Sequence, residues 1–150
     1  MSIATQILKH TTVAQRPREL HILYTTRLPA SRSLAEVLFY ERLQSLVNVA
    51  AADQNPRSQR PDVSLRLFLT NAREGETAGG VSDGVQTLSR RIKQGDLVSA
   101  IDGSGEGGVE GRARTVVYVC GPPGMTDEFV EVCRGVEGMG GERVLCEKWW

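Results

Sequence analysis

The sequence predicts an α/β fold with a parallel sheet. Four short apolar runs have the length and composition of buried strands, and segments of helical spacing lie between them. Strands that alternate with helices are typical of a parallel sheet covered by helices. The chain has 150 residues, of which 40% are hydrophobic and 24% charged, so it can bury one core of ordinary size.

The four predicted strands are rich in β-branched, aliphatic and aromatic residues. Each has about four to eight residues between polar residues, glycine or proline, and this length favours a buried strand over a buried helix. The predicted strands cover residues 20–24, 63–70, 115–120 and 143–146.

Two segments carry the main helix signals. Ser33 and Glu36 form a predicted capping box, which opens a helix with apolar residues on one broad face. Thr126 is the predicted N-cap of a second helix, whose carboxyl end we expect at the glycine-rich segment 138–141. A shorter helix is predicted over 96–101, between the second and third strands.

Two glycine-rich segments, 73–84 and 102–111, are predicted to be surface loops. The second contains the pattern G-x-G-x-x-G at positions 103–108. A dinucleotide-binding fingerprint needs a strand before the glycines and an apolar helix after them. Here the preceding segment is predicted helical and the following one has no helix signal, so we reject that interpretation.

Charge and cysteine content exclude several classes of function. Eighteen basic and eighteen acidic residues give zero net charge, which argues against nucleic acid or a membrane as a partner. No apolar run reaches the roughly 20 residues of a membrane-spanning helix, and no secretory signal is evident. The cysteines, Cys120, Cys133 and Cys146, lack CxxC spacing, so we expect reduced thiols, no metal site and an intracellular, cytoplasmic or mitochondrial protein.

The segment 116–126 carries the strongest functional signal. A predicted strand ends at Cys120 and continues into Gly121, Pro122 and Pro123 before a helix begins. Ligands of parallel α/β sheets bind at the carboxyl ends of the strands, glycine permits close approach, and proline makes the turn rigid. The alternative is a tight turn beside a small buried thiol.

The last residues of the chain are a second signal. Glu147 and Lys148 are followed by Trp149 and Trp150, directly after the last predicted strand. Indole rings need a partner for each N–H when they are buried. We consider two interpretations: an aromatic plug over the edge of the core, and a flat lid that stacks on a planar cofactor.

Together, the Cys-Gly-Pro-Pro-Gly-Met block at 120–125 and the Glu-x-Trp end at 147–149 resemble the NAD(P)-binding domain of the ferredoxin–NADP reductase family. The similarity is closest to the oxidoreductase NAD-binding domain-containing proteins and covers most of the chain. It implies a Rossmann-like parallel sheet of order 3-2-1-4-5 with helices on both faces. Residues 1–10 are similar to the first helix of such a domain.

The resemblance implies an FAD-dependent oxidoreductase that transfers hydride between NAD(P)H and flavin. It places Cys120 beside the nicotinamide ring and Glu147 near the reacting centre, both as catalytic residues. Thr70 to Arg73 stand where the family often has Ser-Arg, so the choice between NAD and NADP stays open. The residues expected to bind the cofactor are Arg27, Thr70, Asn71, Arg73, Gly121, Pro122, Pro123, Met125, Trp149 and Trp150.

In the family a strand and a glycine-rich turn precede the first helix, and an FAD-binding barrel lies further upstream. This sequence begins with the helix, so we expect an N-terminally truncated, partial NAD(P)-binding domain over 1–150 without the central first strand or the barrel. Flavin would come from a missing domain or another chain, and the module would be inactive alone. Two alternatives are a non-catalytic interaction module with weak or no nucleotide binding, and a thiol enzyme that depends on Cys120.

Overall fold

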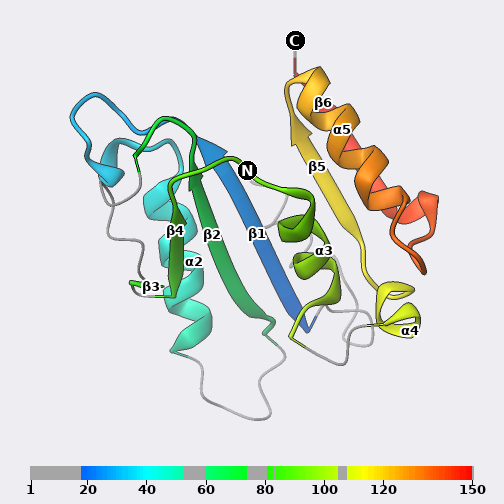
Figure 1. Cartoon of the computed structure of the whole chain (residues 1–150). Coiled ribbons are helices and arrows are strands. Elements are labelled where there is room, and N and C mark those ends of the chain that lie inside the picture. Colours follow the sequence, from blue (N-terminus) through cyan, green and yellow to red (C-terminus); the bar gives the residue numbers. More distant parts are fainter. Residues whose placement is uncertain (1–17, 53–59, 74–80, 83, 105–107, 150) are drawn as a thin grey trace. The chain divides into compact units, whose positions relative to one another are not determined.

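The structure is a computed structural model (Figure 1). Its backbone divides into two compact units, Met1–Arg91 and Ile92–Trp150. The helix predicted over 1–10 and the residue Trp150 lie outside the described residues. The residues that the structure describes are 18–52, 60–73, 81–82, 84–104 and 108–149.

The first unit contains a four-stranded sheet of order β1-β2-β4-β3. Strands β1, β2 and β4 are parallel, whereas β3 is antiparallel to β4. This arrangement confirms the predicted α/β class with parallel strands. The elements are β1 (Glu19–Thr26), a 3-10 turn (Leu34–Glu36), α2 (Tyr40–Ala51), β2 (Asp62–Leu69), β3 (Val81–Ser82) and β4 (Val85–Leu88).

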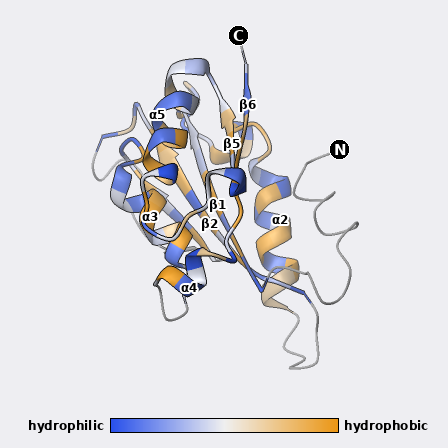
Figure 2. Cartoon of the chain, turned by 90° about the vertical axis from the view of Figure 1, so that its right-hand side faces the viewer, coloured by the Kyte–Doolittle hydropathy of each residue, from blue (hydrophilic) through white to orange (hydrophobic). Residues whose placement is uncertain are grey.

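The core of the first unit lies between the sheet and α2. Alternate residues of β2 point to one face of the sheet, and Leu65, Leu67 and Leu69 are almost fully buried there. Val47 of α2 and Val85 of β4 belong to the same cluster. Figure 2 shows hydrophobic and hydrophilic residues alternating around α2, as expected for a helix with one buried face.

The helix predicted to start at the capping box is interrupted in the structure. The Ser33 side chain makes no capping hydrogen bond, and only a single 3-10 turn follows it. Phe39 then has a φ of 65°, a left-handed conformation that a helix interior does not accept, and α2 begins at Tyr40. The predicted helix start was wrong because the apolar pattern counted Val37 and Leu38 as members of one helix face. In the structure the break separates them: Val37 is buried, whereas Leu38 is 65% exposed.

The sequence did not predict β3 and β4. Part of the predicted loop 73–84 forms β3, and β4 directly follows it. β4 has only four residues, and its alternation of buried and exposed side chains is too short to be distinctive. Its parallel pairing with β2, in which Leu65 lies opposite Val85, specifies the strand.

The second unit contains a parallel pair of strands and helices that pack on them. Its core joins Ile101 of the first helix to residues of both strands and of the long helix, including Val119, Cys133 and Val144. The elements are α3 (Gln94–Asp102), α4 (Val109–Arg112), β5 (Val117–Gly121), α5 (Pro123–Arg134), a 3-10 turn (Gly141–Arg143) and β6 (Val144–Lys148). The four strands predicted from the sequence are therefore all present, as β1, β2, β5 and β6.

Both predicted ends of α5 need correction. The helix starts at Pro123, so Thr126 lies inside it, where the side chain is 0% exposed. The Thr126 hydroxyl does not cap the helix. It donates a hydrogen bond to the carbonyl oxygen of Gly121, in the strand that precedes the helix. The helix ends at Arg134 with Gly135 as its C-cap, before the glycine-rich segment 138–141.

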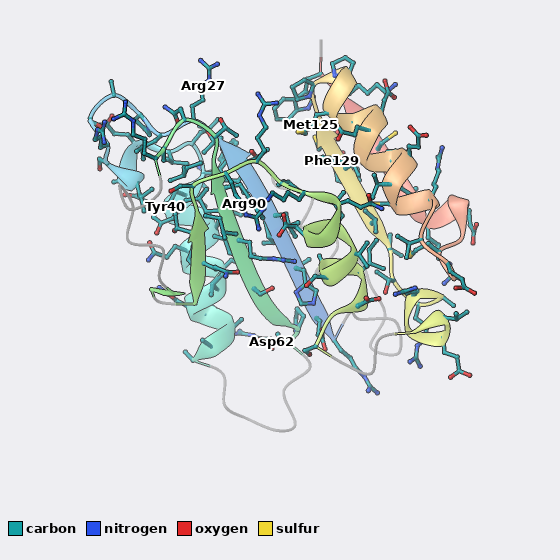
Figure 3. The ribbon with its side chains drawn as sticks, viewed as in Figure 1. Arg27, Tyr40, Asp62, Arg90, Met125 and Phe129 are labelled. Atoms are coloured by element: carbon teal, nitrogen blue, oxygen red, sulfur yellow. The ribbon has the colours of Figure 1, made fainter. Side chains whose placement is uncertain are left out.

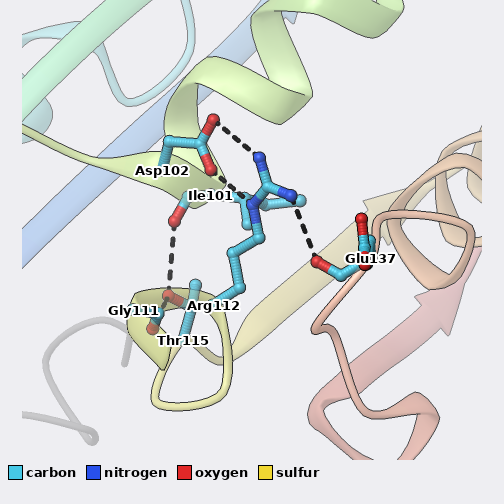
Figure 4. Close-up of polar contacts among 6 residues, drawn as sticks. All are labelled: Ile101, Asp102, Gly111, Arg112, Thr115 and Glu137. Atoms are coloured by element: carbon cyan, nitrogen blue, oxygen red, sulfur yellow. Dashed lines mark hydrogen bonds and ion pairs between the residues drawn. The ribbon is translucent and has the colours of Figure 1, made fainter. Parts of the chain in front are cut away.

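One-turn helix α4 also contradicts the prediction, which gave no helix after the glycine pattern. Arg112, the last residue of α4, ties this turn to its surroundings. Its guanidinium donates to both carboxylate oxygens of Asp102 and to the carbonyl oxygen of Glu137 (Figure 4). Thr115 adds bonds from its hydroxyl to two backbone carbonyls. The element before the pattern is helix α3, as predicted, and not a strand.

No helix in the described part of the chain combines the length and the apolar character needed to cross a membrane.

Candidate functional site

The carboxyl ends of β5 and β6 bring the two predicted catalytic residues together. The strands run parallel, and Cys120 is the register partner of Glu147. Partners in adjacent strands point to the same face of the sheet, so the thiol and the carboxylate lie side by side. Cys120 is half-buried and Glu147 is exposed, so a ligand can reach both.

Tyr118 is a third member of this cluster, and sequence reasoning missed it. It precedes Cys120 by two residues in β5, on the same face, and its hydroxyl donates a hydrogen bond to Oε2 of Glu147. This bond raises the pKa of Tyr118 above its ordinary value, and partial burial and the nearby Cys120 raise it further. The two-residue periodicity of the strand was the available signal, because it places positions 118 and 120 on one face.

Gly121 ties the end of β5 to the next two elements. Its carbonyl oxygen accepts a hydrogen bond from the Thr126 hydroxyl at 3.1 Å and from the Trp149 backbone N–H at 2.9 Å. The terminal methyl group of Met125 lies where a side chain on Gly121 would begin. The structure thus brings three predicted cofactor-binding residues, Gly121, Met125 and Trp149, to the same strand end.

The two prolines form the turn that the sequence suggested. Pro122 is the residue before α5, with a φ of −58°, and Pro123 is the first residue of the helix. Pro122 accepts the first helical hydrogen bond, from the Thr126 backbone N–H at 3.0 Å. Because proline has a restricted φ, this strand-to-helix turn is held in one conformation at little entropic cost.

Trp149, the last of the described residues, does not belong to the hydrophobic core of the second unit, and Trp150 lies outside the described residues. The Trp149 side chain is 52% exposed. Its backbone is held by the bond to Gly121, while the ring stays accessible. This leaves an exposed aromatic surface one residue beyond β6.

The remaining predicted residues follow β1 and β2 in the first unit. The Asn71 side chain joins the two strand ends, since its Oδ1 accepts from Leu28 N–H at 2.6 Å and its Nδ2 donates to Leu28 O at 3.0 Å. The Thr70 hydroxyl donates to the carbonyl oxygen of Thr26. The amide of Asn71 and the hydroxyl of Thr70 are therefore engaged within the chain.

Arg27 and Arg73 are exposed next to these strand ends. Figure 3 shows Arg27 beyond the carboxyl end of β1, whereas Asp62 lies at the opposite end of the same sheet. Met125 and Phe129, labelled in the same figure, both belong to α5. In Rossmann-like sheets, the carboxyl end is the edge that faces a ligand.

A separate polar cluster lies near the amino ends of β1 and β2. His21 is the register partner of Ser64, and its Nδ1 is 2.7 Å from the Ser64 hydroxyl oxygen. Its Nε2 is 3.0 Å from Oε2 of Glu19, two residues earlier on the same strand. Both ring nitrogens therefore take part in hydrogen bonds, whereas among the described residues the Glu147 carboxylate is bonded through one oxygen.

No family model, curated protein or solved structure matches this chain. The chemistry of the site follows from its groups. A carboxylate accepts hydrogen bonds and a thiol is a weak donor. Such a strand end can bind a planar ring that carries N–H donors.

Proposed function

We propose that the chain is the pyridine-nucleotide-binding module of an FAD-dependent NAD(P)H oxidoreductase. The pairing of Cys120 with Glu147 at the carboxyl ends of β5 and β6 carries this proposal. Ligands of parallel α/β sheets bind outside these ends. The two residues that the family resemblance expects beside the nicotinamide are neighbours in space, although they are 27 positions apart in the sequence.

The groups at this strand end suit a nicotinamide ring. Apart from its chain neighbours, the side-chain atom nearest to the place where a side chain on Gly121 would begin belongs to the flexible end of Met125, with the Thr126 hydroxyl further away. A planar group could therefore approach the backbone if this methyl group moved. The Glu147 carboxylate has Oε1 available to accept an N–H of the carboxamide, since its bond within the described residues uses Oε2. Cys120 flanks the same position from the neighbouring strand.

Bound NAD(P)H supplies a hydride, which flavin accepts. The contribution of this chain is to hold the nicotinamide in one orientation and to keep water away, because hydride transfer needs close and aligned rings. In this proposal Cys120 and Gly121 line the ring, Glu147 orients its carboxamide, and Trp149 covers the flavin side.

The same proposal assigns Arg27 and Arg73 to the adenosine ribose or its phosphate, for which the guanidinium fork is suited. FAD is bound by a part of the protein outside residues 1–150 or by another chain. We further propose that β1 and β2 correspond to strands 2 and 3, and β5 and β6 to strands 4 and 5, of the family order 3-2-1-4-5. The first strand is then not among those described, and β4 and β3 extend the sheet beyond β2. The three cysteines are free thiols, which supports a reducing compartment such as the cytoplasm or mitochondrial matrix.

The test is calorimetric titration of the whole chain with NADH and NADPH. Glu147→Gln should weaken binding about tenfold, because hydrogen bonds to charged groups contribute roughly 1.5–3 kcal/mol. Cys120→Ala should weaken it less, since a thiol is a weak donor. The matched control is Cys146→Ala, which removes an exposed thiol beside Glu147 in sequence and should leave the affinity unchanged.

A wild-type chain that is folded but binds neither nucleotide would refute this function and favour an interaction module. Equal losses in Cys146→Ala and Cys120→Ala would show that the strand end is not the site. Addition of FAD and an artificial electron acceptor gives a further check, since we expect no NADH oxidation by the chain alone.

A further inference from the structure

Tyr118 is the one polar side chain of the β5–β6 face that the proposed function does not use. Its ring stands on the same face as Cys120 and Glu147, and its hydroxyl donates to Oε2 of the Glu147 carboxylate. The two residues are diagonal neighbours, since Tyr118 pairs in register with Leu145 and Glu147 lies two residues further on. Long side chains can bridge such a diagonal in a sheet.

The bond restricts a side chain that is otherwise free to move. Glu147 lies one residue before the end of β6 and is exposed, and this hydrogen bond is its side-chain contact within the described residues. A glutamate without such a bond samples several rotamers. Because Tyr118 lies within β5, with strand residues on both sides, its backbone is held in place and it provides a positioned donor for the carboxylate.

The nature of the donor also matters. A lysine in this place would neutralise the carboxylate, whereas a neutral phenol orients it and leaves its charge. The pKa of Tyr118 is raised, so the hydroxyl keeps its proton throughout the physiological range. With Oε2 engaged, Oε1 is the oxygen that can accept a hydrogen bond from a ligand.

We propose that Tyr118 is a positioning residue, which holds Glu147 so that Oε1 accepts an N–H of a primary carboxamide on the bound ring. This inference rests on the proposed function and adds to it the group that determines carboxamide recognition. Tyr118 itself need not touch the ligand. Its removal should therefore affect only ligands that present the amide N–H.

The experiment compares two ligands that differ in this group. NAD⁺ carries the carboxamide, and its 3-acetylpyridine analogue has a methyl group in place of the NH₂. We expect the wild-type chain to bind NAD⁺ about tenfold more tightly than the analogue, as one hydrogen bond to a carboxylate allows. Tyr118→Phe should reduce this ratio to about threefold or less, with the affinity for the analogue unchanged.

Three further variants separate positioning from a structural role. Glu147→Gln should lower the ratio as far as Tyr118→Phe or further, and the double variant should match Glu147→Gln, because both changes act through one bond. Tyr40→Phe removes a hydroxyl from α2 in the other unit and should keep the wild-type ratio. A tyrosine that only supported the fold would weaken both ligands equally.

Four results would overturn the inference. An unchanged ratio in Tyr118→Phe, or an equal loss for both ligands, would show that the hydroxyl does not position Glu147. A wild-type chain that binds both ligands equally would show that the carboxylate does not recognise the amide. This result would remove the orienting role of Glu147, whereas pyridine-nucleotide binding itself would stand. A wild-type chain that binds neither would overturn the proposed function together with this inference.

Discussion

The two parallel strand pairs, β1–β2 and β5–β6, each bring polar side chains together across neighbouring strands, but the two clusters differ in how many of their polar atoms are hydrogen-bonded. In the first pair the imidazole of His21 is bonded on both sides, by Ser64 and by Glu19. In the second pair Glu147 accepts one bond from Tyr118, through one of its two oxygens. In the first cluster both ring nitrogens take part in hydrogen bonds. In the second, Oε1 of Glu147 makes no hydrogen bond among the described residues, and the proposed function assigns this oxygen to a ligand.

The position along the strands also differs. His21 and Ser64 are the third residues of their eight-residue strands, while Cys120 and Glu147 are the fourth residues of strands with five. Carboxyl ends face ligands in parallel sheets. The same cross-strand geometry is therefore structural near the amino end of one pair and suited to binding at the carboxyl end of the other.

The two pairs differ as well in how their carboxyl ends are held. The ends of β1 and β2 are joined by the exposed side chain of Asn71, which bonds to the backbone of Leu28. The end of β5 is held by Thr126, whose side chain is 0% exposed and bonds to the carbonyl of Gly121. Burial makes the second bond more costly to lose, because water cannot replace it.

The largest effect is therefore expected for Thr126→Val, which keeps the shape of the side chain but removes the buried hydroxyl donor to the Gly121 carbonyl. This carbonyl keeps only its bond from the Trp149 backbone N–H among the described residues. We expect a loss of about 1–3 kcal/mol in the free energy of unfolding, measured by urea denaturation. Asn71→Ala should cost less, since solvent can replace its bonds to Leu28. A greater loss in Asn71→Ala would contradict the comparison.

An intermediate effect is expected for Ser64→Ala in the first cluster. The variant removes the hydroxyl next to His21 Nδ1 and should lower the free energy of unfolding by about 1 kcal/mol. Nucleotide affinity should stay at the wild-type value, because this cluster lies near the amino ends of the strands. If Ser64→Ala weakened NADH binding as much as Glu147→Gln, the two clusters would not differ in function.

The last prediction concerns the pH dependence of stability that arises from the ionisation of Tyr118. The Glu147 carboxylate raises the pKa of Tyr118, so the folded chain retains this proton to higher pH than the unfolded chain. The resulting stability is complete below the ordinary tyrosine pKa of about 10 and is lost as pH rises through the raised value. Glu147→Gln should move the ionisation of Tyr118 to lower pH.

Ultraviolet absorbance during an alkaline titration measures this shift, and Tyr118→Phe identifies the signal. Tyr24 provides an internal control, since its pKa is raised chiefly by burial and should not respond to Glu147→Gln. A Tyr118 pKa that is the same in the wild-type chain and in Glu147→Gln would show that the hydrogen bond to Glu147 does not raise it.

Much of the fold was predictable because it depends on local patterns. The runs that became β1, β2, β5 and β6 are apolar, short and bounded by turn-forming residues. The four-residue β4 and the break at Phe39 were not predictable, because the neighbouring strand and the packing of the core determine them.

The candidate site shows the same division. The sequence predicted that Cys120 ends a strand and that Glu147 follows another, but their pairing depends on the register of β5 and β6. Tyr118 had no signal of its own apart from the period of the strand. Its hydrogen bond requires two segments that are 29 positions apart.

By itself, the sequence determined the α/β class, the four main strands and the strand-turn-helix segment around Gly121, because apolar periodicity and the fixed φ of proline act over a few residues. Only the tertiary structure decided where helices begin and which polar groups meet. The late start of α2 after the break at Phe39 depends on packing against the sheet, and the contact of Tyr118 with Glu147 joins residues that are distant in the chain. Strand register and burial bring them together, and neither can be derived from local patterns.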